Sequence, residues 1–385
     1  MQRALGLSEW LALGRAIAGG SLLRYDIGNR GFTARFEHQL SEKLGTRHVL
    51  TVNSGTSALI AALVGAGIGP GDEVLVPAYT WVSTAIAPLA VGAVPILVDI
   101  NESLTIDPED IRRKITPYTR AIIPVHMLNL VCDMDPISSI AKQFKLKIIE
   151  DACQAVGAIY RGRRVGTIGE VGAFSFNQHK NLNAGEGGAV LTNDDRIFTR
   201  ARIYHDAGSY ERQLGLDVDE PVFAGVNFKV SELTGAVLYA QLPRLDPLLR
   251  RLSRRRAMMT KYLATSKGFR ISPHNDPANA IGLTVIFDDA DRAKNFAAHR
   301  GVQRLIDTHR HIYTNWIPIL TQRTFDERMS PYKWAHRKIS YSANECSRSL
   351  DILNRTCSIS LGENYPFGLM QLRAKVLASS IAQLA

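Results

Sequence analysis

Short apolar runs alternate with longer segments of helical periodicity through the first half of the chain. The runs have the length of buried strands, and the segments between them repeat apolar residues every three or four positions. Strands are expected at 48–52, 73–76, 94–98, 121–125, 146–150, 173–176 and 188–192, and helices at 56–66, 83–91, 108–115 and 136–144. This alternation predicts an α/β fold in which a mostly parallel sheet is covered on both faces.

The pattern changes towards the C-terminus. Helical periodicity extends from residue 231 to about 262, with interruptions expected near Pro243 and Pro247 because proline lacks a backbone N–H. Beyond Phe269 the segments are shorter, with a strand within 282–287 and a helix at 291–301. A single core rarely exceeds about 250 to 300 residues, and the chain has 385. We therefore expect a large domain over residues 1–250, beginning with a helical segment over about 1–22, and a small C-terminal α+β domain over 251–385.

The composition is that of a globular protein, with 45% apolar residues and 30 glycines. The most apolar stretch, at 81–97, contains serine, threonine, proline and glycine, so no membrane span is expected. Glu9 and Arg15 interrupt the N-terminal apolar pattern, which lacks the continuous core of a signal peptide. Four cysteines without a CxxC pair indicate reduced thiols and no metal site. These features predict a cytoplasmic protein with no membrane partner.

The formal net charge of +10 is compatible with binding nucleic acid, with binding small anions, or with surface solubility alone. Seven of the basic residues lie between 244 and 261 at helical spacing, which favours one solvated helix face. Binding of a phosphate-bearing substrate or of nucleic acid by this face is the alternative. No helix-turn-helix or zinc pattern accompanies it, so no nucleic-acid partner is expected.

Candidate chemistry lies directly after the predicted strands, because open parallel sheets bind ligands at the carboxyl ends of their strands. After the first strand, Gly55 permits close backbone approach, and Thr56 and Ser57 open a helix whose free N–H groups suit a phosphate. A helix cap is the structural alternative for these hydroxyl side chains. Trp81 follows the next strand, where its ring could stack on a flat cofactor or simply belong to the core.

Two further strand ends carry ionisable groups. Asp151 directly follows a buried strand, where a carboxylate needs a cationic partner such as a protonated pyridine nitrogen. Lys180 precedes a loop rich in glycine, but a P-loop has its glycines before the lysine and Ser or Thr after it. An acid, a rim aromatic, a phosphate-binding helix start and a lysine in a loop of small residues match the requirements of pyridoxal 5'-phosphate (PLP).

At these positions the sequence resembles the sugar aminotransferases of the DegT/DnrJ/EryC1/StrS family over nearly the whole chain. The most specific stretches are 69–74, 150–155, 174–176 together with Lys180, 185–190 and 225–233. The resemblance implies fold type I, the aspartate-aminotransferase type of PLP-dependent transferase. This fold combines a large domain, built on a mixed but mostly parallel sheet, with a small C-terminal α+β domain.

The resemblance also implies roles around the cofactor ring. Lys180 is expected to form the Schiff base and to carry protons between the cofactor and the substrate carbon. Asp151 pairs with the pyridine nitrogen, Gln154 contacts the ring hydroxyl, and Trp81 stacks on the ring.

Other residues are expected to hold the cofactor phosphate. Thr56, Ser57 and Ser175 bind it within the chain, next to Gly55. Asn227 is expected to reach the phosphate of the neighbouring subunit, which predicts a homodimer with shared active sites.

The implied reaction moves an amino group from L-glutamate or L-glutamine to a keto sugar in amino-sugar biosynthesis. The sequence leaves open a nucleotide-linked sugar, an octose or octulosonate, and a keto-cyclitol. Stretches 23–25, 125–127 and 347–356 are most similar to the branch that aminates C8 of an octulosonate. Substrate contacts are expected from Tyr25 and, within 309–316, from His309, His311 and Tyr313, with ordinary packing as the alternative for that segment.

Two other functions compete with transamination. Sugar dehydratases of the same family carry histidine in place of the Schiff-base lysine. Lys180 argues against that reaction, although the adjacent His179 keeps it open. A regulatory protein that binds nucleic acid through its basic surface is the non-enzymatic alternative.

Overall fold

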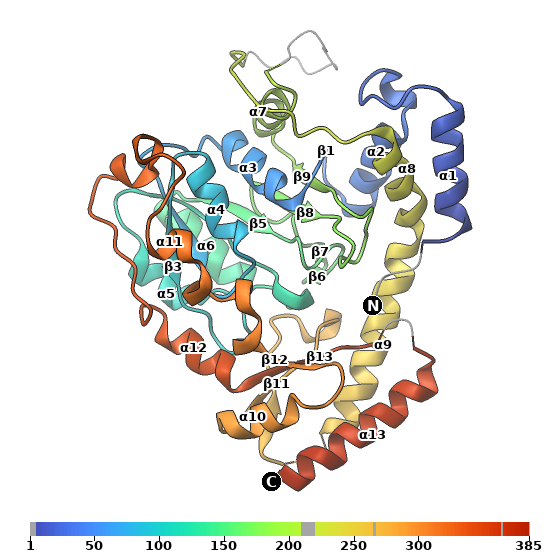
Figure 1. The fold of residues 1–385 in the computed structure, drawn as a ribbon, viewed down its shortest axis with the longest axis vertical. Helices are drawn as coiled ribbons and strands as arrows, with labels where there is room; N and C mark the ends of the chain where they lie inside the picture. The colour runs from blue at the N-terminus through green and yellow to red at the C-terminus, as the bar shows by residue number, and fades with distance from the viewer. Residues whose placement is uncertain (1–4, 209–219, 265–266, 363–364, 385) are drawn as a thin grey trace.

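A seven-stranded sheet forms the centre of the larger part of the computed structural model, which describes residues 5–208, 220–264, 267–362 and 365–384 (Figure 1). The strand order is β1-β9-β8-β5-β4-β2-β3. β9 runs antiparallel to both of its neighbours, and the remaining pairs are parallel. The strands are β1 (His48–Val52), β2 (Glu73–Pro77), β3 (Val94–Val98), β4 (Thr119–Ile122), β5 (Lys147–Asp151), β8 (Val171–Ser175) and β9 (Gly188–Thr192). The predicted mostly parallel sheet is therefore confirmed.

Helices cover both faces of this sheet, because alternate strand residues point to opposite sides. Leu75 belongs to one apolar cluster and its neighbours Val74 and Val76 belong to another. The first cluster includes residues of α2 (Phe32–Leu44), α5 (Pro108–Lys114), α6 (Met134–Phe144) and α8 (Glu232–Gln241). The second includes residues of α3 (Gly55–Gly65), α4 (Ser83–Ala90) and α7 (Asp195–His205).

Two predicted boundaries differ from the observed ones. β4 ends at Ile122 and not at residue 125, since Pro124 cannot donate a ladder hydrogen bond. The helix expected at 291–301 is the shorter α10 (Ala290–Phe296), whose end is followed by turns that lead to Gly301. Gly301 has a φ of +75°, a conformation that favours glycine and ends helical geometry.

A long helical passage connects the large sheet to a smaller one. α8 is followed by a 3₁₀ turn at Leu242–Arg244, and α9 (Leu245–Leu263) then continues with Pro247 in its first turn. The smaller sheet has the order β10-β11-β13-β12 with antiparallel pairs. It consists of β10 (Phe269–Ile271), β11 (Thr284–Phe287), β12 (Val302–Arg304) and β13 (Thr356–Ile359), and α10 and α13 (Phe367–Leu384) accompany it. The boundary expected at residue 250 falls inside α9.

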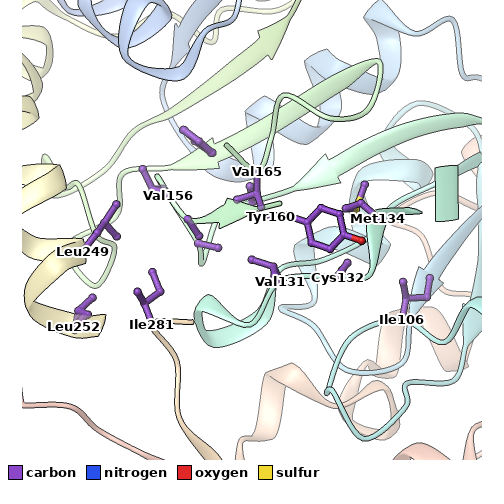
Figure 2. Packing of buried hydrophobic residues seen from close by; sticks show 14 of the residues in the cluster. Ile106, Val131, Cys132, Met134, Val156, Tyr160, Val165, Leu249, Leu252 and Ile281 are labelled. Carbon is purple, nitrogen blue, oxygen red and sulfur yellow. The ribbon is translucent and has the colours of Figure 1, made fainter. Parts of the chain in front are cut away.

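The two parts share one apolar cluster. Figure 2 shows Leu249 and Leu252 of α9 with Ile281, in the cluster that also holds Val156 and Val165 of the large part. In Figure 1, α9 and α13 lie beside each other below the large sheet, and the smaller sheet lies next to them. α9 is packed against both parts, so it belongs to the shared core and is not an exposed linker.

The stretch between β12 and β13 returns to the large sheet. Leu305, Ile312 and Trp316 are buried in the same cluster as Val74 and Val76. This stretch includes α11 (Ile317–Leu320), which Figure 1 shows near α4, and α12 (Ser347–Asn354), which lies lower, below α5. The small domain was predicted to contain all residues after 250. The stretch between β12 and β13 instead buries its apolar residues against the large sheet.

The expected N-terminal amphipathic helix is α1 (Leu7–Ala18), which packs on α8. Ala12 and Ala16 are buried against Ala236, while Trp10 is exposed. Within the part of the chain that the structure describes, no helix has the length and apolar character required to cross a membrane. All four cysteines are free thiols.

Candidate active site

The carboxylate of Asp151 lies buried at the end of β5 and is held by two donors. The Thr84 hydroxyl lies 2.7 Å from Oδ2, and the Cys153 backbone N–H donates to Oδ1 at 3.1 Å. Because a carboxylate accepts, Thr84 must donate to it, and the Thr80 hydroxyl at 2.7 Å then donates to Thr84. These contacts fix the orientation of the Asp151 carboxylate.

Glu150, the neighbouring acid, has a different environment. Successive strand residues face opposite sides, so Glu150 points away from the side of Asp151. Its buried carboxylate accepts backbone N–H groups of Gly166, Ile168 and Gly169, and lies 3.1 Å from Nε2 of His126. Glu150 therefore holds the loop before β8 in place, and Asp151 is the acid that faces the site.

Lys180 lies in the loop that joins β8 to β9. The loop turns back on itself, with the Phe176 N–H donating to the carbonyl of Gly187 at 2.8 Å. Gly187 has a φ of +146°, which a side chain rarely permits. Lys180 is half-buried, and it lies close enough to Cys153 and His311 for its positive charge to act in the direction of a lower pKa at both. The structure thus brings Lys180 to the same strand ends as Asp151.

The start of α3 lies against the ends of β5 and β8. A Cβ on Gly55 would lie 2.8 Å from Cβ of Ser175 and 3.0 Å from Sγ of Cys153. A side chain at this position would therefore clash with the residues at the strand ends. The cap of α3 is Ser54, whose Oγ accepts the Ser57 N–H at 3.0 Å. The capping role proposed as the alternative for Thr56 and Ser57 is therefore taken by another residue, and the helix start fits a phosphate.

The hydroxyl groups of Thr56 and Ser57 already have neighbours in the chain. The Thr56 hydroxyl donates to Ser83 at 2.9 Å, and the Ser57 hydroxyl donates to Oδ1 of Asn53 at 2.6 Å. A hydroxyl has one rotatable hydrogen, so Thr56 or Ser57 would donate to an anion by turning this hydrogen away from its present acceptor, while its oxygen can still accept. Ser175 is buried beside Gly55.

Trp81 and Gln154 both contact His311. Trp81 follows β2, its side chain is 40% exposed, and its ring centroid lies 5.2 Å from that of His311 at an interplanar angle of 60°. Gln154 Nε2 lies 3.3 Å from Nε2 of His311. Backbone hydrogen bonds bring the His311 segment here: the Thr80 N–H donates to the carbonyl of His311 at 2.9 Å. The chain that follows β12 therefore completes the rim at the end of β2.

The other residues expected to contact substrate in this segment differ from His311. His309 is exposed, with a φ of +47°. The Tyr313 ring is fully buried, its hydroxyl donates to the carbonyl of Ala343, and it accepts the Cys346 N–H at 3.2 Å. The position of Tyr313 contradicts a direct substrate contact, because both the ring and the hydroxyl serve packing.

Tyr25 belongs to a second group of residues. Its hydroxyl lies 2.7 Å from Nε2 of His205 at the end of α7, and the following residue, Asp206, pairs with Asn227 through an isolated bridge. Phe228 accepts the Asn53 N–H at 2.8 Å, which places this group next to the end of β1. Asn227 itself is exposed. Tyr25 therefore contacts His205, and its prediction as a substrate residue is not supported within a single chain.

Thr84 and Cys153 contact the site but were not among the predicted residues. Thr80 lies before α4 and Thr84 lies in its first turn, and their hydroxyl groups meet at 2.7 Å. Two threonines that flank Trp81 in the sequence were the available signal. For Cys153 no side-chain signal exists, since its backbone N–H makes the contact with Asp151.

The chain matches the model of the DegT/DnrJ/EryC1/StrS aminotransferase family over residues 24–361. The chain belongs to this family. It is 37% identical over 298 residues to a dTDP-3-amino-3,4,6-trideoxy-alpha-D-glucose transaminase of Streptomyces venezuelae, with 77% of this chain and 74% of the relative aligned. It is 39% identical over 219 residues to the GDP-perosamine synthase of Caulobacter vibrioides, covering 56% of this chain and 57% of the relative. For several similar curated proteins, including the GDP-perosamine synthase, the matched part spans less than two thirds of the relative.

Solved structures agree with fold type I. The DesV protein of Streptomyces venezuelae, solved in complex with a ketimine intermediate, superposes with a TM-score of 0.76 at 30% identity, over 98% of this chain and 94% of that chain. The 3-amino-5-hydroxybenzoic acid synthase superposes with a TM-score of 0.80 at 25% identity, over 100% and 98%. The predicted family and fold class are both confirmed.

Proposed function

We propose that this protein is a PLP-dependent aminotransferase that moves an amino group from L-glutamate or L-glutamine to a keto sugar in amino-sugar biosynthesis. The observation that carries the proposal is the placement of Lys180 and the buried carboxylate of Asp151 at the same strand ends, beside the start of α3. An amine and a fixed acid on one side of a phosphate-binding helix start are the groups that PLP requires.

The residues around Lys180 would hold PLP in a defined orientation. The start of α3 with Thr56, Ser57 and Ser175 would bind its phosphate, and Asp151 would pair with its ring nitrogen. When bound, PLP supplies an electron sink for bonds at the substrate carbon. Lys180 would hold and move the proton at that carbon through its amine, and Trp81, which is 40% exposed, would cover the ring and exclude water.

The proposed acceptor is a keto sugar or a keto-cyclitol. The relatives include the dTDP-sugar transaminase and the GDP-perosamine synthase, and also an L-glutamine:2-deoxy-scyllo-inosose aminotransferase of Streptoalloteichus tenebrarius. The first two names contain nucleotide-linked amino sugars and the third contains a cyclitol ketone, so amination of a carbonyl carbon in a polyhydroxylated ring is the reaction that would connect them. The octulosonate branch remains one member of the same class of acceptor.

The dehydratase alternative depends on Lys180 rather than on the fold. A GDP-4-keto-6-deoxy-D-mannose-3-dehydratase superposes with a TM-score of 0.79 at 17% identity, so the fold accommodates both reactions. His179 is exposed, and its Nε2 lies 3.3 Å from Nε2 of Gln178. Lys180, by contrast, is half-buried and interacts electrostatically with Cys153 and His311. This difference favours Lys180 as the functional residue and supports transamination.

The proposal includes a homodimer with shared active sites and a cytoplasmic location. Asn227 is exposed beside the end of β1. In the proposed dimer, its side chain would contact the cofactor phosphate of the neighbouring subunit. The basic residues of α9 need no nucleic-acid partner. Arg255 is buried and its guanidinium donates to the carbonyls of Leu361 and Tyr365, so part of this charge serves the packing of α13.

The first experiment is an absorption spectrum of the purified protein with added PLP. The wild type should show a Schiff-base band at about 420 nm, as the cofactor chemistry requires. Lys180→Ala should lose the band, and the exposed Lys142→Ala should keep it. A colourless wild type would refute the proposal. A panel of amino sugars and aminocyclitols with 2-oxoglutarate, run in the reverse direction, would then identify the acceptor.

A further inference from the structure

The hydrogen bonds of His311 determine which of its ring nitrogens carries a proton. Nδ1 lies 3.1 Å from the carbonyl oxygen of Thr308. A carbonyl oxygen only accepts, so Nδ1 carries the hydrogen and donates it. In the neutral ring, Nε2 then has a free lone pair and accepts.

The side chain of Gln154 agrees with this tautomer. Its Oε1 lies 3.3 Å from the backbone nitrogen of Leu128, which donates. The amide orientation is thereby set, and Nε2 of Gln154 faces Nε2 of His311 at 3.3 Å. An amide nitrogen only donates, so this contact is favourable only when the His311 nitrogen is unprotonated.

The surroundings of His311 favour the neutral ring. Burial is the main cause that lowers its pKa below 6.5, the carbonyl of Thr308 acts in the opposite direction, and the positive charge of Lys180 lowers it further. The rings of Trp81 and Tyr79 pack against it, with centroids 5.2 Å and 6.4 Å away. Arg310 is a further cation nearby, with its guanidinium 5.9 Å from the Trp81 ring.

Backbone groups anchor this pair of side chains at both ends. Leu128 has a φ of +52°, and its N–H holds one end of the Gln154 amide. The backbone carbonyl of His311 accepts the Thr80 N–H, which fixes the ring next to Trp81. Hydrogen bonds therefore run without a break from the Thr308 carbonyl through His311 and Gln154 to the Leu128 N–H, and they use one of the two amide hydrogens of Gln154.

We propose that His311 is a positioning residue: its unprotonated Nε2 accepts one amide hydrogen of Gln154 and so directs the second amide hydrogen towards the ring hydroxyl of PLP. This inference rests on the proposed function, because it requires PLP at Lys180. It differs from a direct substrate contact, in which His311 would act on the sugar and not through Gln154.

A hydrogen bond from Gln154 stabilises the ionised ring hydroxyl of PLP. Loss of this hydrogen bond should raise the pKa at which the Schiff-base absorption band titrates, called the band pKa below. His311→Phe keeps an aromatic ring beside Trp81 but removes the acceptor. We expect it to raise the band pKa by about one unit, the size of a hydrogen bond to a charged group. His311→Gln, whose side-chain carbonyl can accept, should restore most of the wild-type value. His38→Phe, at a histidine of α2 whose side chain is 73% exposed, is the matched control and should leave it unaltered.

The test is a spectrophotometric pH titration of each holoenzyme, together with the dissociation constant of PLP measured by titrating the cofactor-free protein. The decisive comparison uses Gln154→Leu: in that background His311→Phe should cause no further shift, because the two residues act as a unit. An equal shift with and without Gln154 would overturn the proposal. So would an unchanged band pKa accompanied by a raised KM for the keto sugar. A colourless wild type refutes the proposed function as well, whereas a coloured protein with an unaltered pKa refutes the role of His311 alone.

Discussion

The hydroxyl of Thr84 lies 2.7 Å from Oδ2 of Asp151, and both side chains are buried. Thr84 belongs to α4 and Asp151 ends β5, so this contact links the strand that carries the acid to the helix that follows Trp81. Removal of the hydroxyl would leave a buried carboxylate with one donor fewer, and hydrogen bonds to charged groups contribute about 1.5 to 3 kcal/mol.

We therefore expect Thr84→Val to weaken PLP binding by roughly 10-fold or more, because Asp151 would no longer be held towards the ring nitrogen. Titration of the cofactor-free protein with PLP measures this effect. Thr84→Ser retains the hydroxyl and should bind nearly as tightly as the wild type. Thr80→Val, which leaves the bond between Thr84 and Asp151 intact, should have a smaller effect. Tight binding by Thr84→Val would show that the hydroxyl does not position the acid.

Gly55→Ala tests the close approach of α3 to the strand ends. The added Cβ would lie 2.8 Å from Cβ of Ser175, so the helix start must shift away from the site. We expect a loss of about 1 to 3 kcal/mol in unfolding free energy from this overpacking, together with weaker PLP binding.

Gly14→Ala is the matched control for that substitution. Gly14 lies within α1, and a Cβ there meets nothing within 4 Å. It should leave PLP binding unchanged and stabilise the protein by up to about 1 kcal/mol, since alanine favours helix over glycine. The measurements are urea unfolding and PLP titration, and similar behaviour of the two variants would contradict the packing argument.

Stability should fall on acidification because of His205. Burial is the main cause that lowers the pKa of this fully buried histidine to about 4. In the unfolded chain it takes up a proton near its ordinary value of 6.5, so the unfolded state binds more protons between these values. The unfolding free energy should therefore decrease as the pH falls from 6.5 towards 4, by at most on the order of 3 kcal/mol from this residue.

Urea unfolding of the cofactor-free protein across this pH range tests the prediction. His205→Gln removes the titrating group and should show a shallower dependence on pH, although its stability at neutral pH should be lower because glutamine does not fill the space of the buried imidazole ring. His38→Gln, at a side chain 73% exposed, should keep the wild-type slope. An unchanged slope in His205→Gln would mean that other groups cause the acid sensitivity.

Asn227 permits a test of shared active sites by subunit mixing. Lys180→Ala and Asn227→Ala should each be weakly active or inactive alone. If Asn227 acts on the neighbouring subunit's phosphate, a mixed dimer of the two variants contains one site with both residues intact, and mixing should restore activity. If Asn227 acts within its own chain, neither site of the mixed dimer is complete. Activity after unfolding and refolding the mixture distinguishes these outcomes.

Local pattern was sufficient for the strands and for the residues at their ends. Lys180 and Asp151 follow β8 and β5, and parallel strands place their carboxyl ends on one edge regardless of the rest of the chain. Gly55, Thr56 and Ser57 were identifiable for the same reason, since a helix that begins after a strand presents its free N–H groups at that edge. These positions depend on hydrophobic periodicity and on chain direction, which a sequence contains.

The sequence by itself therefore determined the fold class and the positions of Lys180, Asp151 and the start of α3 at the strand ends, where we propose that PLP binds. Only the tertiary structure decided that His311 lies beside Trp81 and Gln154, that Tyr313 is in the core, and that Tyr25 contacts His205. It also decided that the stretch between β12 and β13 returns to the large sheet. The reason is physical: these contacts join residues distant along the chain, and such pairs depend on which apolar surfaces bury against each other rather than on any local spacing.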